Sequence, residues 1–516
     1  MKKLLIYLFI FTIMLSSCNS TENDKENNTA TTINLSDEKI TVNGNEITNQ
    51  TSSAVYAAND IIFYLEGNDF TYGEGTKDDE HSQSEADAHT VVHITKPGKY
   101  LLSGKLSKGQ IAVDLGDDAK DDENAVVTLV FNGVDITCNV APAIIFYNVY
   151  ECGNKNESKA SKDVDTSKAG ANVIIADSTV NNINGSYVAK IYDPESVILN
   201  DSKTEVKDAD KLHKYDGAFY SKMSININGE KNNTGILNIN AENEGLDSEL
   251  HLTINGGIIN IIAGNDGINT NEDNVSVTTI NGGTLNILCD GSTGEGDGID
   301  SNGWLIINGG TIISQACSTS GDAGIDSDKG IYINGGRVVA TGNMLDRIAG
   351  GEQNFVVFNF KSRQSENGNY VLKSSNGGFS NNYATKNAFT YLIISSEDLT
   401  EGDYTLWQGE TQLSGSKATA LQGGMPNGER PENPIGRPGQ TPDGEMPEPP
   451  NGQRPEPPNG QMPEPPNGER PEFPDGERPE MPEIPDGFNG FTDSKVSVTF
   501  KITKGGNYFN NVSPAN

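Results

Sequence analysis

The sequence predicts an all-β protein: a right-handed parallel β-helix followed by a small C-terminal β unit that a proline-rich insertion interrupts. Three observations support this prediction. The pattern Ile-Asn-Gly-Gly recurs every 26 or 27 residues between residues 254 and 336. Apolar and polar residues alternate over short runs between these repeats, as in β-strands. The chain has 57 glycines and only 34% hydrophobic residues, a composition that excludes a helical bundle.

Alignment of the repeats assigns their buried and exposed faces. Mostly apolar residues fall into columns, and stacking these columns buries one continuous core. One such column contains Ile254, Ile280, Ile307 and Ile333. The asparagine that follows each of these residues forms an outward ladder, in which side-chain amides bond from one repeat to the next. We predict that residues from about Lys96 to Gly342 form one right-handed parallel β-helix, with the handedness that parallel crossovers favour.

The N-terminal residues predict export and lipidation. Lys2 and Lys3 precede an apolar run that is too short to span a membrane and that ends at Leu15-Ser16-Ser17-Cys18, an ending that resembles a bacterial lipobox. The prediction is a signal peptide over 1–17, a lipidated Cys18, and a flexible tether over 18–32. The protein would then lie on the extracellular face of the bacterial envelope, anchored by lipid. The alternative is an ordinary secretory signal in which the cysteine is incidental.

The remaining segments are assigned from composition. A β-helix domain is expected over 33–350 and a β cap unit over 351–421. Residues 422–487 repeat proline, glycine and glutamate, which favours an extended, solvated linker. Apolar and polar residues alternate again within 488–516, so we predict a C-terminal strand that returns to the cap unit.

Net charge narrows the range of partners. The chain has 37 Lys and Arg against 72 Asp and Glu, a formal charge of −35. Nucleic acid is therefore not expected as a partner, because its phosphates are bound by clustered basic side chains.

Acidic side chains also form columns along the repeats. We consider these columns candidate metal ligands: Glu244, Asp266, Asp297 and Asp322 in one, and Asp247, Asn269, Asp300 and Asp326 in the other, with Asp216 beneath them. Carboxylates about 4.8 Å apart repel by roughly 3 kcal/mol at an effective dielectric of about 20. A bound cation would relieve this repulsion, and calcium suits such irregular oxygen ligands. The alternative is that these side chains only cap turns by accepting hydrogen bonds from backbone amides.

Two stretches carry a resemblance to a known family. DGIDSNGWLIINGGTIIS (297–314), with its sister repeats, and KPGKYLLSGKLSKGQIAVDL (96–115) resemble the bacterial carbohydrate-binding domain-containing family. The resemblance implies an extracellular right-handed parallel β-helix akin to that of pectate lyases. It also implies bound calcium and a polysaccharide partner such as cellulose or an acidic, pectin-like glycan. We therefore expect non-catalytic, calcium-dependent polysaccharide binding by a monomer.

Trp304 and Tyr332 are the candidate sugar-binding residues. Both are predicted to point outward from neighbouring repeats, where their rings would stack on successive sugars while a cation on the acidic columns bridges to uronic carboxylates. Burial of both rings beneath the C-terminal unit is the alternative.

Two other functions stay open. A polysaccharide lyase or hydrolase could use the same scaffold, although Arg337 is the only credible base on the repeats and no catalytic residue is assigned. A structural adhesin is the third possibility. Zinc is not expected, whereas Cys289 and Cys317 are spaced so that a disulfide between adjacent repeats is conceivable.

Overall fold

The computed structural model describes residues 30–418 and 496–515, and this part of the chain is all-β, as predicted. Its helical segments are short: α1 (Gln83–Asp87), η1 (Asp117–Asp121) and η2 (Glu157–Lys159). None of these described helices is long and apolar enough to cross a membrane. The predicted signal peptide, Cys18, most of the tether and the proline-rich linker lie outside the described residues.

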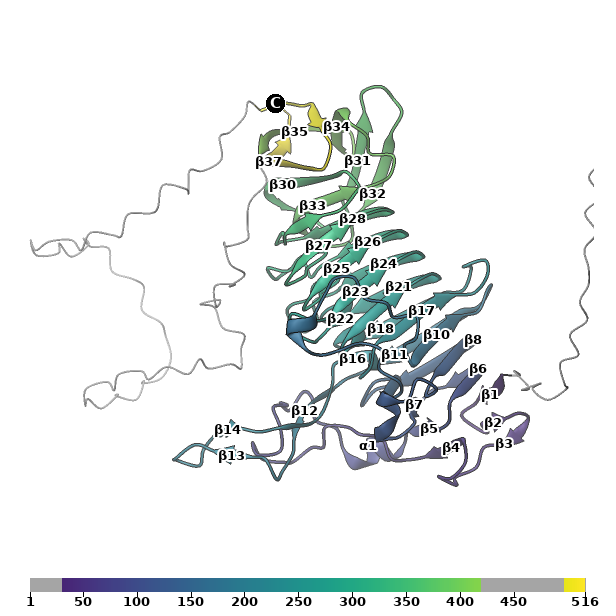
Figure 1. Cartoon of the computed structure of the whole chain (residues 1–516). Helices are drawn as coiled ribbons and strands as arrows, with labels where there is room; N and C mark the ends of the chain where they lie inside the picture. The colour runs from purple at the N-terminus through teal and green to yellow at the C-terminus, as the bar shows by residue number, and fades with distance from the viewer. Residues whose placement is uncertain (1–29, 419–495, 516) are drawn as a thin grey trace, which may run out of the picture.

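Strands of successive repeats stack in parallel in three series (Figure 1). The first series is β10 (Ala171–Ile175), β17 (Ile225–Gly229), β20 (His251–Ile254), β23 (Val277–Ile280), β25 (Trp304–Ile307) and β27 (Gly330–Ile333). The second is β11 (Val180–Gly185), β18 (Ile236–Ala241), β21 (Ile258–Ala263), β24 (Thr284–Cys289), β26 (Thr311–Gln315) and β28 (Arg337–Gly342). The third is β5 (Thr90–Ile94), β7 (Gly109–Asp114), β9 (Ile144–Asn148), β16 (Gly217–Ser221), β19 (Glu244–Ser248) and β22 (Ile268–Thr270).

Longer strands form the N-terminal end of the stack. β6 (Gly98–Leu106) pairs in parallel with β1 (Thr31–Leu35) and with β8 (Val127–Cys138). Because β8 pairs with both β10 and β11, it joins the first two series into one sheet. Shorter strands add antiparallel hairpins at this end: β2 (Thr41–Val42), β3 (Asn45–Glu46), β4 (Val55–Ala58), β12 (Val188–Tyr192), β13 (Ile198–Leu199), β14 (Val206–Asp208) and β15 (Lys211–Tyr215).

The apolar columns stack in the predicted register. Ile254 lies opposite Ile280, which is followed by Ile307 and Ile333, and all four side chains are fully buried. The other columns stack in the same way: Leu252, Thr278, Leu305 and Ile331, and Ile259, Leu285, Ile312 and Val338. The asparagine ladder also forms, with amide-to-amide hydrogen bonds of 2.8 to 2.9 Å from Asn228 up to Asn334.

A separate β unit covers the C-terminal end of the stack, and it has its own apolar core. Its strands are β30 (Phe355–Gln364), β31 (Asn369–Ser374), β32 (Ser380–Ala384), β33 (Phe389–Ser395), β34 (Gly402–Gln408), β35 (Thr411–Ala418), β36 (Phe500–Ile502) and β37 (Gly506–Pro514). The preceding strand, β29 (Ile348–Gly350), extends the first series, because it pairs in parallel with β27. The chain beyond residue 495 returns to this unit, where β36 pairs with β34, and β37 lies between β30 and β35.

The disulfide considered between Cys289 and Cys317 is not formed. The four cysteines in the described residues are free: Cys138, Cys152, Cys289 and Cys317. Leu288 is paired with Gln315, so the register brings Ala316 opposite Cys289. Cys317 therefore lies one position further along the chain. The Cys289 thiol instead donates to the carbonyl oxygen of Asp297 at 3.0 Å.

Candidate functional site

Three carboxylates meet where the third series of strands begins its regular repeats. Asp216, Glu244 and Asp247 each place one oxygen within 4.8 Å of the others. Glu244 and Asp247 belong to β19, whereas Asp216 directly precedes β16, the parallel neighbour of β19. The glycine after Asp216 makes room for the cluster, because a Cβ atom on Gly217 would lie only 2.6 Å from the Cβ of Asp247. We call Asp216, Glu244, Asp247 and Asn269 the carboxylate cluster.

Asn269 completes the cluster from the next strand. It lies on β22 opposite Asp247, and its amide nitrogen donates to Glu244 Oε1 at 3.0 Å. Glu244, Asp247 and Asn269 are 6%, 0% and 7% exposed. Three of their oxygens, Glu244 Oε2, Asp247 Oδ2 and Asn269 Oδ1, are buried without a hydrogen-bond partner. Leaving such groups unpaired costs about 1–3 kcal/mol each, and more for charged groups.

The environment disfavours the charged form of these carboxyl groups. Burial raises the pKa of Glu244 and of Asp247 well above the usual range, and repulsion from nearby carboxylates adds to both shifts. Two basic groups oppose this effect: Lys214, whose Nζ lies 2.6 Å from Asp216 Oδ2, and Lys211, whose charge also lowers the pKa of Asp216 and Asp247. Burial disfavours the ammonium of Lys214, but attraction to Asp216, Glu244 and Asp247 outweighs burial and raises its pKa.

These residues fit a hard divalent cation. When all three carboxyl groups are ionised, they and the Lys214 ammonium together carry two negative charges. One divalent ion would neutralise these charges. The unpartnered atoms are carboxylate and amide oxygens, the ligands that calcium prefers. The fit therefore rests on the orphaned oxygens as well as on the number of acidic groups.

The other predicted ligands have different surroundings. The backbone amide of Asp297 donates to Asp266 Oδ1 at 2.7 Å, and that of Ala323 donates to Asp297 Oδ1 at 2.6 Å. Asp322 accepts from the amide of Gly296 at 2.6 Å. These three carboxylates thus bond the turns of neighbouring repeats together.

Asp300 and Asp326 continue the column of Asp247 and Asn269. The amide of Asp300 donates to the carbonyl of Ile268 at 2.8 Å, and that of Asp326 donates to the carbonyl of Ile299 at 2.7 Å. All eight predicted residues therefore follow the stack, but the structure gathers Glu244, Asp247 and Asn269 around Asp216.

Sequence reasoning missed Lys214. Lys214 lies upstream of the Ile-Asn-Gly-Gly repeats, which begin at Ile254, so their alignment does not include it. A usable signal was present, because Lys214 and Asp216 are separated by two positions, the spacing that puts side chains on one face of an extended segment. Arg337, the only base considered on the repeats, contacts the C-terminal unit instead. It donates to Asn381 and lies 5.5 Å from the ring centroid of Tyr383.

The two candidate sugar-binding aromatics lie on adjacent strands of the first series. Trp304 is opposite Gly330, and Tyr332 is opposite Ile306, so the two rings are offset by two positions, as predicted. Both side chains are half-buried. Lys162 Nζ lies 5.3 Å from the centroid of the Tyr332 ring, so a charged side chain already contacts that aromatic face.

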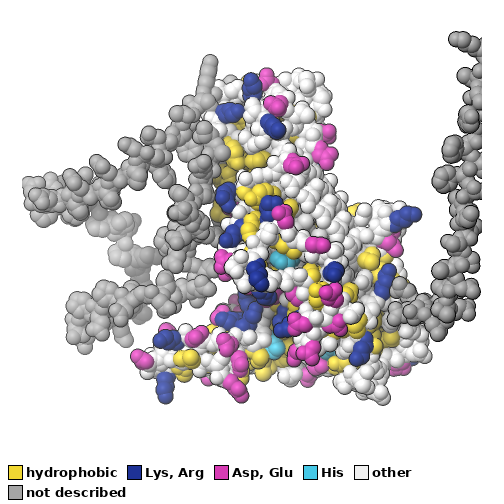
Figure 2. Space-filling view, in the orientation of Figure 1, with side chains coloured by type: hydrophobic (Ala, Val, Ile, Leu, Met, Phe, Trp, Pro, Cys, Tyr) yellow, Lys and Arg dark blue, Asp and Glu magenta, His cyan; other side chains and the backbone are white. Residues whose placement is uncertain are grey.

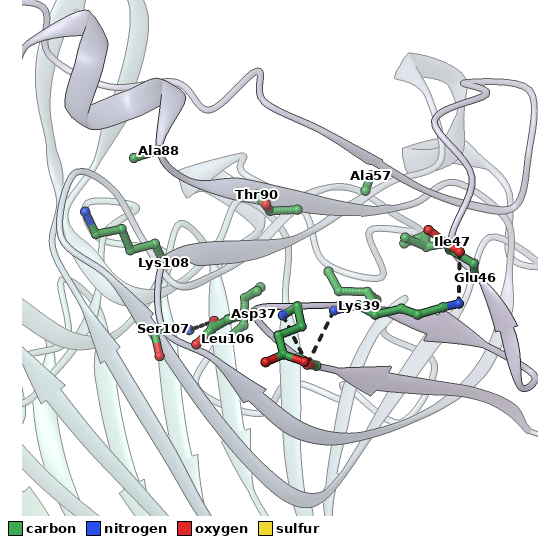
Figure 3. A pocket seen from close by; sticks show the side chains of 13 residues that line it. Asp37, Lys39, Glu46, Ile47, Ala57, Ala88, Thr90, Leu106, Ser107 and Lys108 are labelled. Atoms are coloured by element: carbon green, nitrogen blue, oxygen red, sulfur yellow. Dashed lines mark hydrogen bonds and ion pairs between the residues drawn. The ribbon is translucent and has the colours of Figure 1, made fainter.

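A cavity of about 490 Å³ opens at the N-terminal end of the stack, away from the carboxylate cluster (Figure 3). Three of its charged lining residues have partners within the lining: Lys39 pairs with Glu46 at 2.9 Å, and Asp37 accepts from the Ser107 amide at 2.6 Å. Figure 2 shows acidic and basic side chains interspersed over the lower part of the visible face. Neither this cavity nor the mixed surface indicates a ligand that carries charge of mainly one sign.

Comparison with known proteins identifies the family. The model of the carbohydrate-binding domain-containing protein family matches residues 88–156 and 158–417. A search of curated proteins found no match. Among solved structures, a polysaccharide lyase-like protein from C. thermocellum, determined as a gadolinium derivative, is 20% identical, with 63% of this chain and 93% of that chain covered and a TM-score of 0.34. Because the family model spans well over half of the sequence, the chain belongs to the carbohydrate-binding domain-containing family.

Proposed function

We propose that this protein binds polysaccharide without transforming it, and that calcium in the carboxylate cluster stabilises its fold as a right-handed parallel β-helix. The observation that carries the calcium site is the convergence of three buried, unpartnered oxygens from Glu244, Asp247 and Asn269. Family membership supports carbohydrate as the ligand. The remaining acidic residues of the columns are not needed for this site.

The cation would act on the fold and not on the glycan. The cluster joins β16, β19 and β22, three successive strands of one series, and β17 and β20 follow β16 and β19 along the chain. We do not extend to this cluster the expected bridge from a cation to uronic carboxylates, because Glu244, Asp247 and Asn269 are at most 7% exposed and the Asp216 side chain is 13% exposed. A ligand that binds only the folded state adds RT ln(1 + [L]/Kd) to stability.

The proposal includes a location that the described residues do not test. We place the protein on the outer face of a bacterial envelope as a monomer, held by lipid on Cys18 after removal of 1–17. Mass spectrometry of the protein expressed in a bacterium should find a diacylated N-terminal peptide that begins at Cys18. A mature N-terminus at any other residue would contradict the anchor.

A lyase is the less favoured alternative. Removing a sugar proton requires an unprotonated base, and the acidic neighbours of Lys214 keep its amine protonated. Arg337 is engaged by Asn381 and Tyr383. A hydrolase would need a separated pair of carboxyl groups that face substrate, whereas two of the three carboxylates in the cluster are at least nine-tenths buried.

The test is a glycan array probed with the full chain in calcium and in chelator. We expect binding to polysaccharide in calcium and weaker binding in chelator, with no new reducing ends or unsaturated products. Trp304→Ala in the same assay tests the predicted aromatic contact. Absence of binding to any glycan would favour the structural adhesin, and product formation would favour the enzyme.

A further inference from the structure

A polar groove of about 370 Å³ runs across the first series of strands, on a different face from the carboxylate cluster. Its floor consists of outward side chains of four stacked strands, β10, β17, β20 and β23, and its wall is residues 164–167. The floor residues are Asn172, Asn226, Asn228, Thr253, Asn255, Thr279 and Asn281. We call this feature the amide groove.

Buried hydrogen bonds fix the wall to the floor. The hydroxyl of Thr166 donates to Asn226 Oδ1 at 2.8 Å and lies 2.7 Å from the hydroxyl of Thr253. In return, the side-chain amide of Asn226 donates to the Thr166 carbonyl at 2.8 Å. All three side chains are at least 94% buried. The groove is therefore preformed, and binding a ligand would not require ordering of this wall segment.

The exposed floor retains hydrogen-bonding capacity. Asn255 donates to Asn228 and accepts from Asn281, and Asn281 in turn accepts from Asn308. A side-chain amide has two N–H donors and two lone pairs on its oxygen. In the ladder each asparagine donates one hydrogen bond and accepts one, which together use half of that capacity. Asn255 and Asn281 thus each offer one donor and one acceptor beyond the ladder. A sugar hydroxyl, which both donates and accepts, matches that pair.

Charge distinguishes the amide groove from the rest of the molecule. Of its eleven lining residues, only Asp165 is ionisable, although the chain carries a formal charge of −35. Hydrogen bonds from Ser167 hold the pKa of Asp165 below its usual range, so this carboxyl is negative at neutral pH. An acidic glycan would meet repulsion here without a basic partner among the lining residues, whereas an uncharged glycan would not.

We infer that the amide groove binds a neutral, hydroxyl-rich oligosaccharide that lies along the stack, beside the asparagine ladder. This inference rests on the proposed polysaccharide binding and narrows its substrate class to uncharged glycans. The column of Asn226, Thr253 and Thr279 continues with Ile306 and Tyr332, so a longer chain that leaves the groove along the stack passes toward the two outward aromatics.

The test compares matched ladder residues by calorimetric titration of the full chain. Asn281 lines the groove, and Asn308, the next residue of the ladder, does not; both are exposed, and each donates to the preceding asparagine and accepts from the next. The probes are cellohexaose and hexagalacturonate, which are neutral and acidic hexamers. We expect Asn281→Ala to weaken cellohexaose binding about fivefold to tenfold, as loss of one or two hydrogen bonds predicts. Asn308→Ala should bind within twofold of the parent.

Asp165→Asn refines the charge argument. It should leave the affinity for cellohexaose within twofold and strengthen the weak binding of hexagalacturonate. Equal losses for Asn281→Ala and Asn308→Ala, or tighter binding of the acidic hexamer by the parent, would overturn the amide groove. If neither hexamer nor any arrayed glycan binds the parent, the proposed function itself fails. Glycan binding that Asn281→Ala leaves unchanged rejects only the groove.

Discussion

The carboxylates at the two ends of the acidic columns differ in their hydrogen bonds, although the repeats that carry them have similar sequences. At one end, Asp266 and Asp297 accept hydrogen bonds from backbone amides of the next repeat. At the other end, Glu244 and Asp247 each keep a buried oxygen without a partner. The same acidic column therefore serves in one region as a bond between turns and in the other as a candidate cation site. What differs is whether a backbone amide points at the carboxylate.

The largest expected difference between the two regions is the response to calcium. Chelation should lower the free energy of unfolding by about 2.7 kcal/mol from a calcium concentration of 100 times Kd. Asp247→Asn keeps the shape of the side chain but removes a charge, so it should melt below the parent in calcium and above it in chelator. Calorimetric melting of both proteins with and without chelator measures this reversal. Equal melting of the parent in both conditions would contradict the site.

The backbone-bonded region should respond differently. Asp297→Ala leaves the amide of Ala323 without its 2.6 Å acceptor, and we expect a loss of about 1–3 kcal/mol that is the same in calcium and in chelator. Urea unfolding in both conditions measures it. A loss that appears only in calcium would mean that Asp297 also holds the ion.

The pH dependence of stability is the third way to compare the two regions. Burial raises the folded-state pKa of Glu244, Asp247, Asp266 and Asp297. For such a group, stabilisation is complete below the unfolded pKa of about 4 and is lost as pH rises toward the folded value, at up to about 1.4 kcal/mol per pH unit. In chelator, the melting temperature should therefore fall as pH rises above about 4.

Asp247→Asn in the same pH series separates the regions. It should flatten the slope in chelator, and calcium should flatten the slope of the parent by a similar amount. The slope that remains comes from the other carboxyl groups whose pKa burial raises: Asp216, Glu244, Asp266, Asp297 and Asp346. A slope that neither change affects would show that the carboxylate cluster does not titrate in this range.

Much of the fold could be predicted because the repeat period is a local property of the sequence. The isoleucine column and the asparagine ladder follow from spacing alone, and the structure has both. The division of the acidic columns could not be predicted in this way. It depends on which turn amides approach Asp266 and Asp297, and on Lys214, which comes from a hairpin outside the repeat. The amide groove was missed for the same reason, because its wall is an irregular segment.

The C-terminal unit has a consequence for assembly. A parallel stack ends in an open strand edge to which a second molecule could add by the same register. Here the terminal strand β28 is paired with β33, which runs antiparallel to it. Another copy that met β28 would find a strand of opposite direction, so the second series ends within the chain. The first series differs, because it ends at β29, which runs parallel to β27.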